Sequence, residues 1–235
     1  NENVTETEIK SKIGQLAWIA NQTRPDIAFE VCQASVATKD GDSQRVNRIN
    51  KCVKRLKSQQ TVLKFIPIDF ETAKIVSFAD AAFANLTNGG SQGGFIVFLA
   101  NENRCVPMFW QSKALKRVVE STLSAETMAA MEGGEYCFML KTMLKEILDE
   151  KLDLPIYAFT DSKSLKDSVY STKTLSDKRL KIDICVIRDY LRKKEIKEVC
   201  WITTEKQLAD SLTKAGANSA KLLAVLNSSR LELGL

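Results

Sequence analysis

The stretch that decides the fold is KIVSFAD at positions 74–80, a short β-rich run that ends in an acid. Two runs of the same kind follow it, GFIVFL at 94–99 and RCVPMFWQ at 104–111. Turn-forming residues separate the runs, TNGG at 87–90 and NEN at 101–103. Runs of this composition, bounded by Gly and Asn, predict three consecutive antiparallel strands in a meander.

The chain after this meander alternates between helical and strand patterns. The expected elements are a long helix over 121–150, a strand over 155–160, a short helix over 164–170, a basic helix over about 176–194, a strand over 199–203 and a last helix from about position 205. Helical crossovers between strands make those strands parallel. The sequence therefore predicts an α/β fold with a mixed five-stranded sheet, three antiparallel strands and then two parallel ones, flanked by helices.

The first 69 residues have a helical pattern instead. Apolar residues recur at helical intervals from Ile9, Pro25 separates a first helix from a second, and a third helix starts near Ser43. The outer faces of this third helix carry only basic charges: Arg45, Arg48, Lys51, Lys54, Arg55 and Lys57. This pattern favours contact with a polyanion as much as an ordinary solvated face. We expect two domains, a helical segment over 1–69 and an α/β domain over 70–235.

Composition excludes several classes of function. The 235 residues include 34 Lys and Arg against 29 Asp and Glu, a net charge of +5, and no histidine. Histidine-based nucleophile systems, His-ligated zinc and imidazole bases are therefore excluded. Six cysteines without a CxxC pair favour reduced, buried thiols over a disulfide framework. We expect no membrane span, because no run of about 20 apolar residues exists. We also expect no secretory signal, and we expect the sequence to be a piece of a longer chain.

Four acids stand at element boundaries that the predicted topology brings together: Asp80, Glu126, Asp161 and Asp210. Asp80 and Asp161 end strands whose carboxyl ends meet at one edge of the sheet, where open α/β sheets bind ligands. Like charges that share a confined site are costly unless a cation joins them. Oxygen-only ligands suit Mg²⁺ or Mn²⁺, and two such ions predict phosphodiester hydrolysis without imidazole.

Collinear segments resemble the ribonuclease H region of a Ty1/copia-type retrotransposon polyprotein, preceded by the tail of its reverse transcriptase. These segments are TRPDI at 23–27, KRLK at 54–57, SFAD at 77–80, STLSAE at 121–126, TDS at 160–162 and QLADSLTK at 207–214. They follow the family's order across most of the chain. The stretch 177–196 is similar to a further family segment, although the histidines of that segment are absent.

The resemblance implies a ribonuclease H-like fold and a metal-dependent endonuclease that cuts the RNA strand of RNA–DNA hybrids during reverse transcription. It implies that Asp80, Glu126, Asp161 and Asp210 are the catalytic, metal-binding residues. Asp80 would bridge two Mg²⁺ or Mn²⁺ ions. Glu126 and Asp161 would complete one ion's site, and Asp210 would share the other ion with Asp80.

The same resemblance implies a cellular setting and a partner. Residues 1–69 would be the thumb-like or connection-like tail of the upstream reverse transcriptase, and that polymerase domain of the same polyprotein would be a partner. The implied location is intracellular, in the cytoplasmic retrotransposon particle or in the nucleus. An RNA–DNA hybrid would be the substrate.

A hybrid duplex presents phosphates on both strands and a 2′-OH on only one. Candidates for contact with that hydroxyl are the loop over 85–90, Gln111, Ser112 and Ser124. Basic side chains could hold phosphates and set the register of the duplex. The candidates are Lys178, Arg179, Lys181 and Arg188 in the basic helix, and Lys51, Lys54 and Arg55 in the third N-terminal helix.

Alternatives remain open at this point. Each acid taken alone is more often a surface residue, a strand end or a helix N-cap than a ligand. A weakly active or inactive module of this fold that binds nucleic acid or scaffolds a polymerase would keep the architecture but is expected to lack a carboxylate. A phosphate-binding α/β protein of another kind is disfavoured, because neither GxGxxG nor GxxxxGK[ST] occurs.

Overall fold

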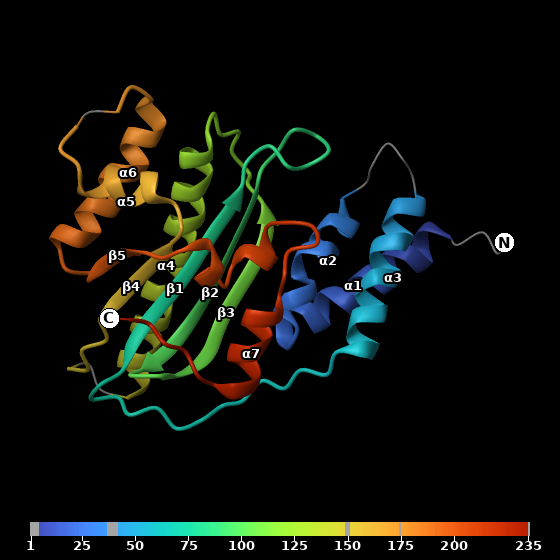
Figure 1. Ribbon diagram of the computed structural model, residues 1–235, viewed down its shortest axis with the longest axis horizontal. Helices are drawn as coiled ribbons and strands as arrows, with labels where there is room; N and C mark the ends of the chain where they lie inside the picture. The colour runs from blue at the N-terminus through green and yellow to red at the C-terminus, as the bar shows by residue number, and fades with distance from the viewer. Residues whose placement is uncertain (1–4, 37–41, 149–150, 174, 235) are drawn as a thin grey trace.

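A computed structural model describes residues 5–36, 42–148, 151–173 and 175–234 (Figure 1). The N-terminal elements are α1 (Glu6–Gln22), the 3-10 turn η1 (Pro25–Ile27), α2 (Ala28–Ser35) and α3 (Asp42–Ser58). A capping box starts α1, because the Thr5 hydroxyl accepts from the Glu8 N–H while the Glu8 carboxylate accepts from the Thr5 N–H. Pro25 separates α1 from α2, as the sequence predicts.

The predicted mixed sheet is confirmed. Its strands are β1 (Lys74–Ala82), β2 (Gln92–Asn101), β3 (Arg104–Ala114), β4 (Ile156–Thr160) and β5 (Glu198–Trp201). Their order across the sheet is β3-β2-β1-β4-β5, with β1, β2 and β3 antiparallel and with β4 parallel to both β1 and β5. This arrangement is the mixed sheet, three antiparallel strands and then two parallel ones, that the sequence predicts, and it makes β1 and β4 neighbours.

Three helices cover one face of the sheet, α4 (Thr122–Ile147), α5 (Lys163–Tyr170) and α6 (Lys178–Arg192) (Figure 1). The predicted end of the long helix at 149–150 lies outside the described residues. Gly133 in α4 allows close packing on β2, since a Cβ there would lie 3.3 Å from the Cβ of Phe95. The glycine in the middle of this helix is therefore explained by its contact with the sheet.

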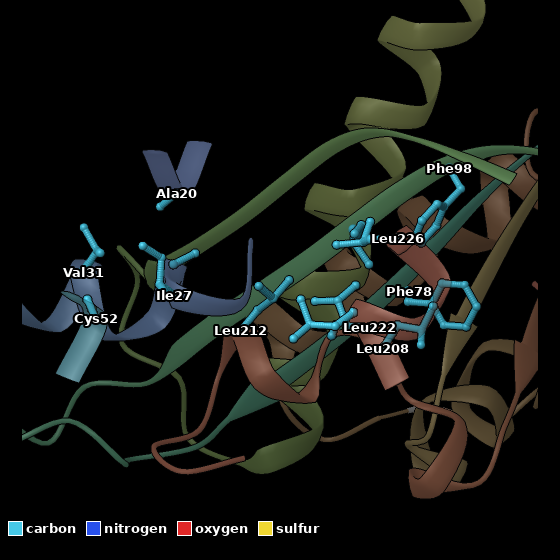
Figure 2. Close-up of a cluster of buried hydrophobic side chains, with 14 of the residues drawn as sticks. Ala20, Ile27, Val31, Cys52, Phe78, Phe98, Leu208, Leu212, Leu222 and Leu226 are labelled. Atoms are coloured by element: carbon cyan, nitrogen blue, oxygen red, sulfur yellow. The ribbon is translucent and has the colours of Figure 1, made fainter. Parts of the chain in front are cut away.

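The opposite face of the sheet packs against elements from both ends of the chain. Figure 2 shows this core, in which Ile27 and Cys52 from the N-terminal helices lie with Leu212 and with Leu222 of α7 (Ala220–Ser228). Phe78 of β1 stacks on Phe159 of β4 within the same cluster, with ring centroids 4.9 Å apart. The N-terminal helical segment and the C-terminal segment thus share one apolar core.

The expectation of a helix from about position 205, with Asp210 inside it, is wrong. The chain instead forms two 3-10 turns, η2 (Thr204–Lys206) and η3 (Asp210–Leu212), and α7 begins only at Ala220. Polar side chains compete with the helical pattern here. The Gln207 side chain accepts from the Ala209 N–H at 3.1 Å, and the Thr213 hydroxyl donates to the Asp210 carbonyl at 3.1 Å.

Four of the six cysteines are buried: Cys52, Cys105, Cys137 and Cys200. Cys32 is half-buried, Cys185 is exposed, and all six thiols are free.

Within the described part of the chain, no helix combines the length and apolar character that crossing a bilayer requires.

Candidate metal centre

Three of the four predicted carboxylates meet at one end of the sheet. Asp80, Glu126 and Asp161 each offer an oxygen, and these oxygens lie within 4.8 Å of one another. The parallel pairing of β1 with β4 brings Asp80 beside Asp161, which follows Thr160 at the end of β4. Glu126 comes from the start of α4, where the Ser121 hydroxyl caps the helix by accepting from the Ser124 N–H at 3.1 Å.

Glu126 lies in surroundings that do not stabilise its ionised form. Its side chain is buried, and its Oε2 atom has no hydrogen-bond partner among the described residues. Burial, followed by the charges of Asp80 and Asp161, raises the pKa of Glu126 to about 9. A buried carboxylate oxygen without a partner is costly, and a divalent cation is the group that would satisfy it. The donor set therefore fits a hard cation with oxygen ligands.

Asp80 is the best connected of the three acids. Burial raises its pKa to about 6, against the lowering effects of Lys214 and of the Thr213 hydroxyl, which donates to Asp80 Oδ2. The Lys214 ammonium lies 3.4 Å from the same oxygen. One protein cation thus partly neutralises the acidic cluster.

Asp210 reaches the cluster through Lys214. Its Oδ1 atom lies 2.5 Å from the Lys214 ammonium, so Lys214 stands between Asp210 and Asp80. The side chain of Asp210 is 25% exposed, whereas that of Asp80 is 2% exposed. Asp210 therefore sits at the open edge of the site and does not belong to the group of three whose oxygens lie close together.

Asp161 is oriented by residues of the segment between β5 and η3. The Thr204 hydroxyl donates to its Oδ2 at 2.9 Å, and the Gln207 amide donates to its Oδ1 at 3.3 Å. Gln207 also donates to the Ala79 carbonyl at 2.9 Å and so ties β1 to Asp161. The Trp201 indole N–H donates to the Asp161 carbonyl at 3.0 Å.

Four residues that support the acids were not predicted as site residues: Thr204, Gln207, Thr213 and Lys214. Three of them lie in QLADSLTK at 207–214, the segment singled out for Asp210. A search for supporting polar residues beside each acid could have found these three. Thr204 carries no comparable sequence signal.

Of the predicted contacts to the 2′-OH, Gln111 and Ser124 stand on different elements, β3 and α4. Gln111 stands on β3 opposite Phe95 of β2, and its Oε1 atom is buried without a hydrogen-bond partner among the described residues. Ser124 is buried at the start of α4, where its hydroxyl lies 3.0 Å from that of Ser121. Ser124 also lines a small cavity together with Arg179.

The basic candidates of α6 differ in their surroundings: some are exposed to solvent, and one makes hydrogen bonds within the protein. Lys178, Arg179 and Lys181 stand in the first turn of α6, whereas the Arg188 guanidinium donates to the carbonyls of Ser168, Val169 and Ser171 at 2.5–3.0 Å. Arg188 thus anchors the end of α5.

The N-terminal basic candidates line an open groove of 560 Å³. Lys51 and Lys54 of α3 are exposed on one wall, and Ala215 and Gly216, which directly follow Lys214, are on the other. Arg55 shares this wall with the lysines and also donates to the Asp26 carbonyl at 2.7 Å. The groove therefore runs from the basic face of α3 to the loop beside the carboxylates.

Comparison with known proteins gives relatives over most of the chain. No protein-family model matches it. It is 27% identical over 217 residues to the retrovirus-related Pol polyprotein from transposon TNT 1-94 of Nicotiana tabacum, and 25% identical over 219 residues to that from transposon RE1 of Arabidopsis thaliana. These alignments cover 90% and 91% of the chain but only 15% and 14% of the polyproteins.

Solved structures with a similar shape were also found. Ribonuclease H1 from the archaeon Halobacterium salinarum is 15% identical, with a TM-score of 0.44, and the match covers 60% of this chain and 94% of that one. The foamy viral protease-reverse transcriptase in complex with an RNA/DNA hybrid is 17% identical, with a TM-score of 0.47 over 93% of this chain and 27% of that one.

Proposed function

We propose that this chain hydrolyses the RNA strand of RNA–DNA hybrids with the help of divalent cations, as the ribonuclease H part of a retrotransposon polyprotein. The observation that carries the proposal is the group formed by buried Asp80 and Glu126 with half-buried Asp161, in which Glu126 Oε2 has no partner among the described residues. The similarity to transposon Pol polyproteins over 90% of the chain supports the same assignment.

The residues that would hold the cations are Asp80, Glu126 and Asp161, with Asp210 at the open edge. Mg²⁺ or Mn²⁺ at such a site supplies Lewis acidity toward the scissile phosphate. The chain itself fixes the ligands: Thr213 orients Asp80, while Thr204 and Gln207 orient Asp161. Neither a histidine nor a covalent nucleophile is needed for this chemistry.

The hybrid would lie across the site on basic surfaces at either side. Support for one of these surfaces is the groove between α3 and the loop after Lys214, with Lys51 and Lys54 exposed along it. Support for the other is the exposed start of α6, where Lys178, Arg179 and Lys181 stand together without an acid in the first turn. Phosphate contacts of this kind set affinity and register.

A labelled RNA–DNA hybrid tests the proposal. We expect the 235-residue chain to cut the RNA strand with Mg²⁺ or Mn²⁺ and not with EDTA. Asp80→Asn removes a ligand charge and should lower the rate by on the order of 10²-fold or more, whereas Asp167→Asn, at an exposed acid of α5, should cut like the parent. An Asp80→Asn variant as fast as the parent would refute the carboxylate assignment.

A second candidate is a non-catalytic module of the same fold that binds nucleic acid. The observation in its favour is Lys214, whose ammonium joins Asp80 and Asp210 and supplies positive charge without a metal. Calorimetry with Mn²⁺ separates the two candidates. Binding of Mn²⁺ that Glu126→Gln abolishes supports the enzyme, whereas hybrid binding without Mn²⁺ binding or cleavage supports the module.

A further inference from the structure

A chain of hydrogen bonds connects the N-terminal helices to the loop that carries Asp210. The amide of Gln33, in α2, donates to Gln92 Oε1 at 3.1 Å. The amide of Gln92, in β2, donates to the Ser112 hydroxyl of β3 at 2.9 Å. Ser112 in turn donates to the Leu212 carbonyl at 2.5 Å. These three bonds therefore run in a single direction, from α2 through the sheet to the loop.

The middle residue of this hydrogen-bond chain, Gln92, is fully buried. Gln92 is 0% exposed, and its amide also points at Cys32 Sγ, 3.5 Å away. A buried amide that loses its partner bears the full cost of desolvation, so Gln92 favours keeping both its bond from Gln33 and its bond to Ser112. The Ser112 hydroxyl is thus linked to α2 through the side chain of Gln92.

The Leu212 carbonyl belongs to the segment that serves the carboxylates, residues 210–214, here termed the 210–214 loop. Asp80 pairs with Gly94 on β2, and a Cβ at Gly94 would lie 2.6 Å from the Leu212 Cβ. Because glycine has no side chain, the 210–214 loop can pack closely on the sheet at Gly94. A second bond fixes the loop, because the Asn85 amide donates to the Thr213 carbonyl at 3.0 Å.

We propose that Ser112, Gln92 and Gln33 are positioning residues that let the N-terminal helical segment set the 210–214 loop. Through the Leu212 carbonyl they hold Thr213 and Lys214 against Asp80. The inference rests on the proposed function for its effect on cleavage, but its effect on the loop is independent of cleavage. It makes residues outside the α/β domain part of the catalytic arrangement.

The first test is kinetic and uses the complete chain. Ser112→Ala removes the donor to Leu212, and we expect kcat on a labelled hybrid to fall by about tenfold with KM unchanged, the size of one lost hydrogen bond. Ser112→Thr keeps the hydroxyl and should restore most of kcat. Ser11→Ala, at an exposed serine of α1, is the matched control and should leave kcat unchanged.

The second test follows the loop itself by hydrogen exchange. Gln33→Ala and Ser112→Ala should each speed amide exchange in the 210–214 loop by about tenfold, while exchange in α4 stays as in the parent. Gln15→Ala, at an exposed glutamine of α1, should change neither region. Melting temperatures identify a variant that fails to fold, in which case the other of the two variants decides.

The outcomes separate the two proposals. If the parent does not cut, the proposed function fails, and exchange in the 210–214 loop alone decides the inference. If Ser112→Ala cuts like the parent and its loop exchange is unchanged, the inference is overturned. It is also overturned if Ser112→Ala loosens the loop but Gln33→Ala does not, because the N-terminal helices would then play no part.

Discussion

Glu126 is the residue whose protonation should dominate the pH dependence of the protein without metal. Its pKa rises from 4.5 to about 9 on folding, so the folded state favours the neutral acid. This contribution to the free energy of unfolding is full below pH 4.5 and is lost as pH rises through about 9. The loss is on the order of 1 kcal/mol for each pH unit between these limits.

Thermal unfolding in EDTA between about pH 5 and about pH 9 checks this prediction. The parent should lose stability as pH rises, and Glu126→Gln, which stays neutral, should show a flatter profile. Asp80 acts in the same direction over a narrower window, from 3.8 to about 6. A divalent cation should stabilise the parent more at about pH 8 than at about pH 6, because the ionised ligands bind it. Parallel profiles for parent and variant would contradict the assignment of the buried charge.

Lys214 competes with divalent cations for the same oxygens. Its ammonium lies 2.5 Å from Asp210 and 3.4 Å from Asp80. Burial lowers the pKa of Lys214, but Asp80 and Asp210 outweigh this effect and the net pKa is raised, so the ammonium stays charged at neutral pH. We expect Lys214→Met to bind Mn²⁺ about fivefold more tightly, the size of one partly exposed ion pair.

Isothermal titration of Mn²⁺ into the two proteins measures this difference. Lys206→Met, at an exposed lysine of η2, is the matched control and should bind like the parent. Unchanged or weaker Mn²⁺ binding by Lys214→Met would show that the ammonium does not compete with the cation.

At the scale of elements, β2 shows how one glycine makes room for the 210–214 loop. A Cβ at Gly94 would meet the Leu212 Cβ at 2.6 Å and the Leu212 carbonyl at 3.2 Å. Gly94→Ala should therefore push the 210–214 loop away and lower the free energy of unfolding by about 1–3 kcal/mol. Urea unfolding measures this loss, and cleavage of the hybrid should fall with it.

Gly14 provides the control for this substitution. It lies inside α1, and a Cβ at this position would have no atom within 4 Å among the described residues, so Gly14→Ala should stabilise the protein by about 1 kcal/mol through helix propensity alone. If Gly94→Ala were as stable as the parent, the close approach of the loop to β2 would not constrain the site.

The elements that periodicity could predict are those whose apolar residues pack regularly. The strands around Phe78 and Phe95 are predicted because short β-rich runs between turn residues are typical of buried strands, and the long helix through Glu126 is predicted because its apolar residues lie on one broad side. The segment around Asp210 is not, because Leu208 and Leu212 are buried at helical spacing although the backbone forms 3-10 turns. Side-chain hydrogen bonds determine the backbone conformation of this segment, and the spacing of apolar residues does not predict such bonds.

The candidate site shows the same division. Strand ends and parallel pairing explain why Asp80 and Asp161 meet, and both facts follow from topology. The place of Asp210 depends on Lys214, and the anchoring of Arg188 depends on carbonyls at the end of α5. These partners come together only in the folded structure, so neither contact could be predicted from residue type and order.

At the scale of the whole molecule, the groove between α3 and the residues Ala215 and Gly216 should carry part of the hybrid. Lys51 and Lys54 are exposed along it. Lys51→Glu with Lys54→Glu should weaken binding and reduce the slope of log affinity against log salt by about two, close to one for each lost phosphate contact. Fluorescence anisotropy with a labelled hybrid, measured in EDTA over a range of salt concentrations, tests this.

The matched control reverses the charge of an exposed lysine on α1. Lys12→Glu changes net charge without touching the groove and should shift the salt slope little. If it weakened binding as much as a single change at Lys51, long-range charge and not the groove would explain the affinity.

The core shared by the two ends of the chain has a consequence for biosynthesis. Ile9 and Leu231 are buried in the same cluster although they are far apart in sequence. On the ribosome, the apolar sides of α1 to α3 emerge long before the sheet and α7 that cover them, and contacts of such long range form slowly. The apolar sides of α1 to α3 that pack on the sheet and on α7 therefore stay uncovered until those elements have been synthesised, and a chaperone that holds the growing polypeptide would bind them there.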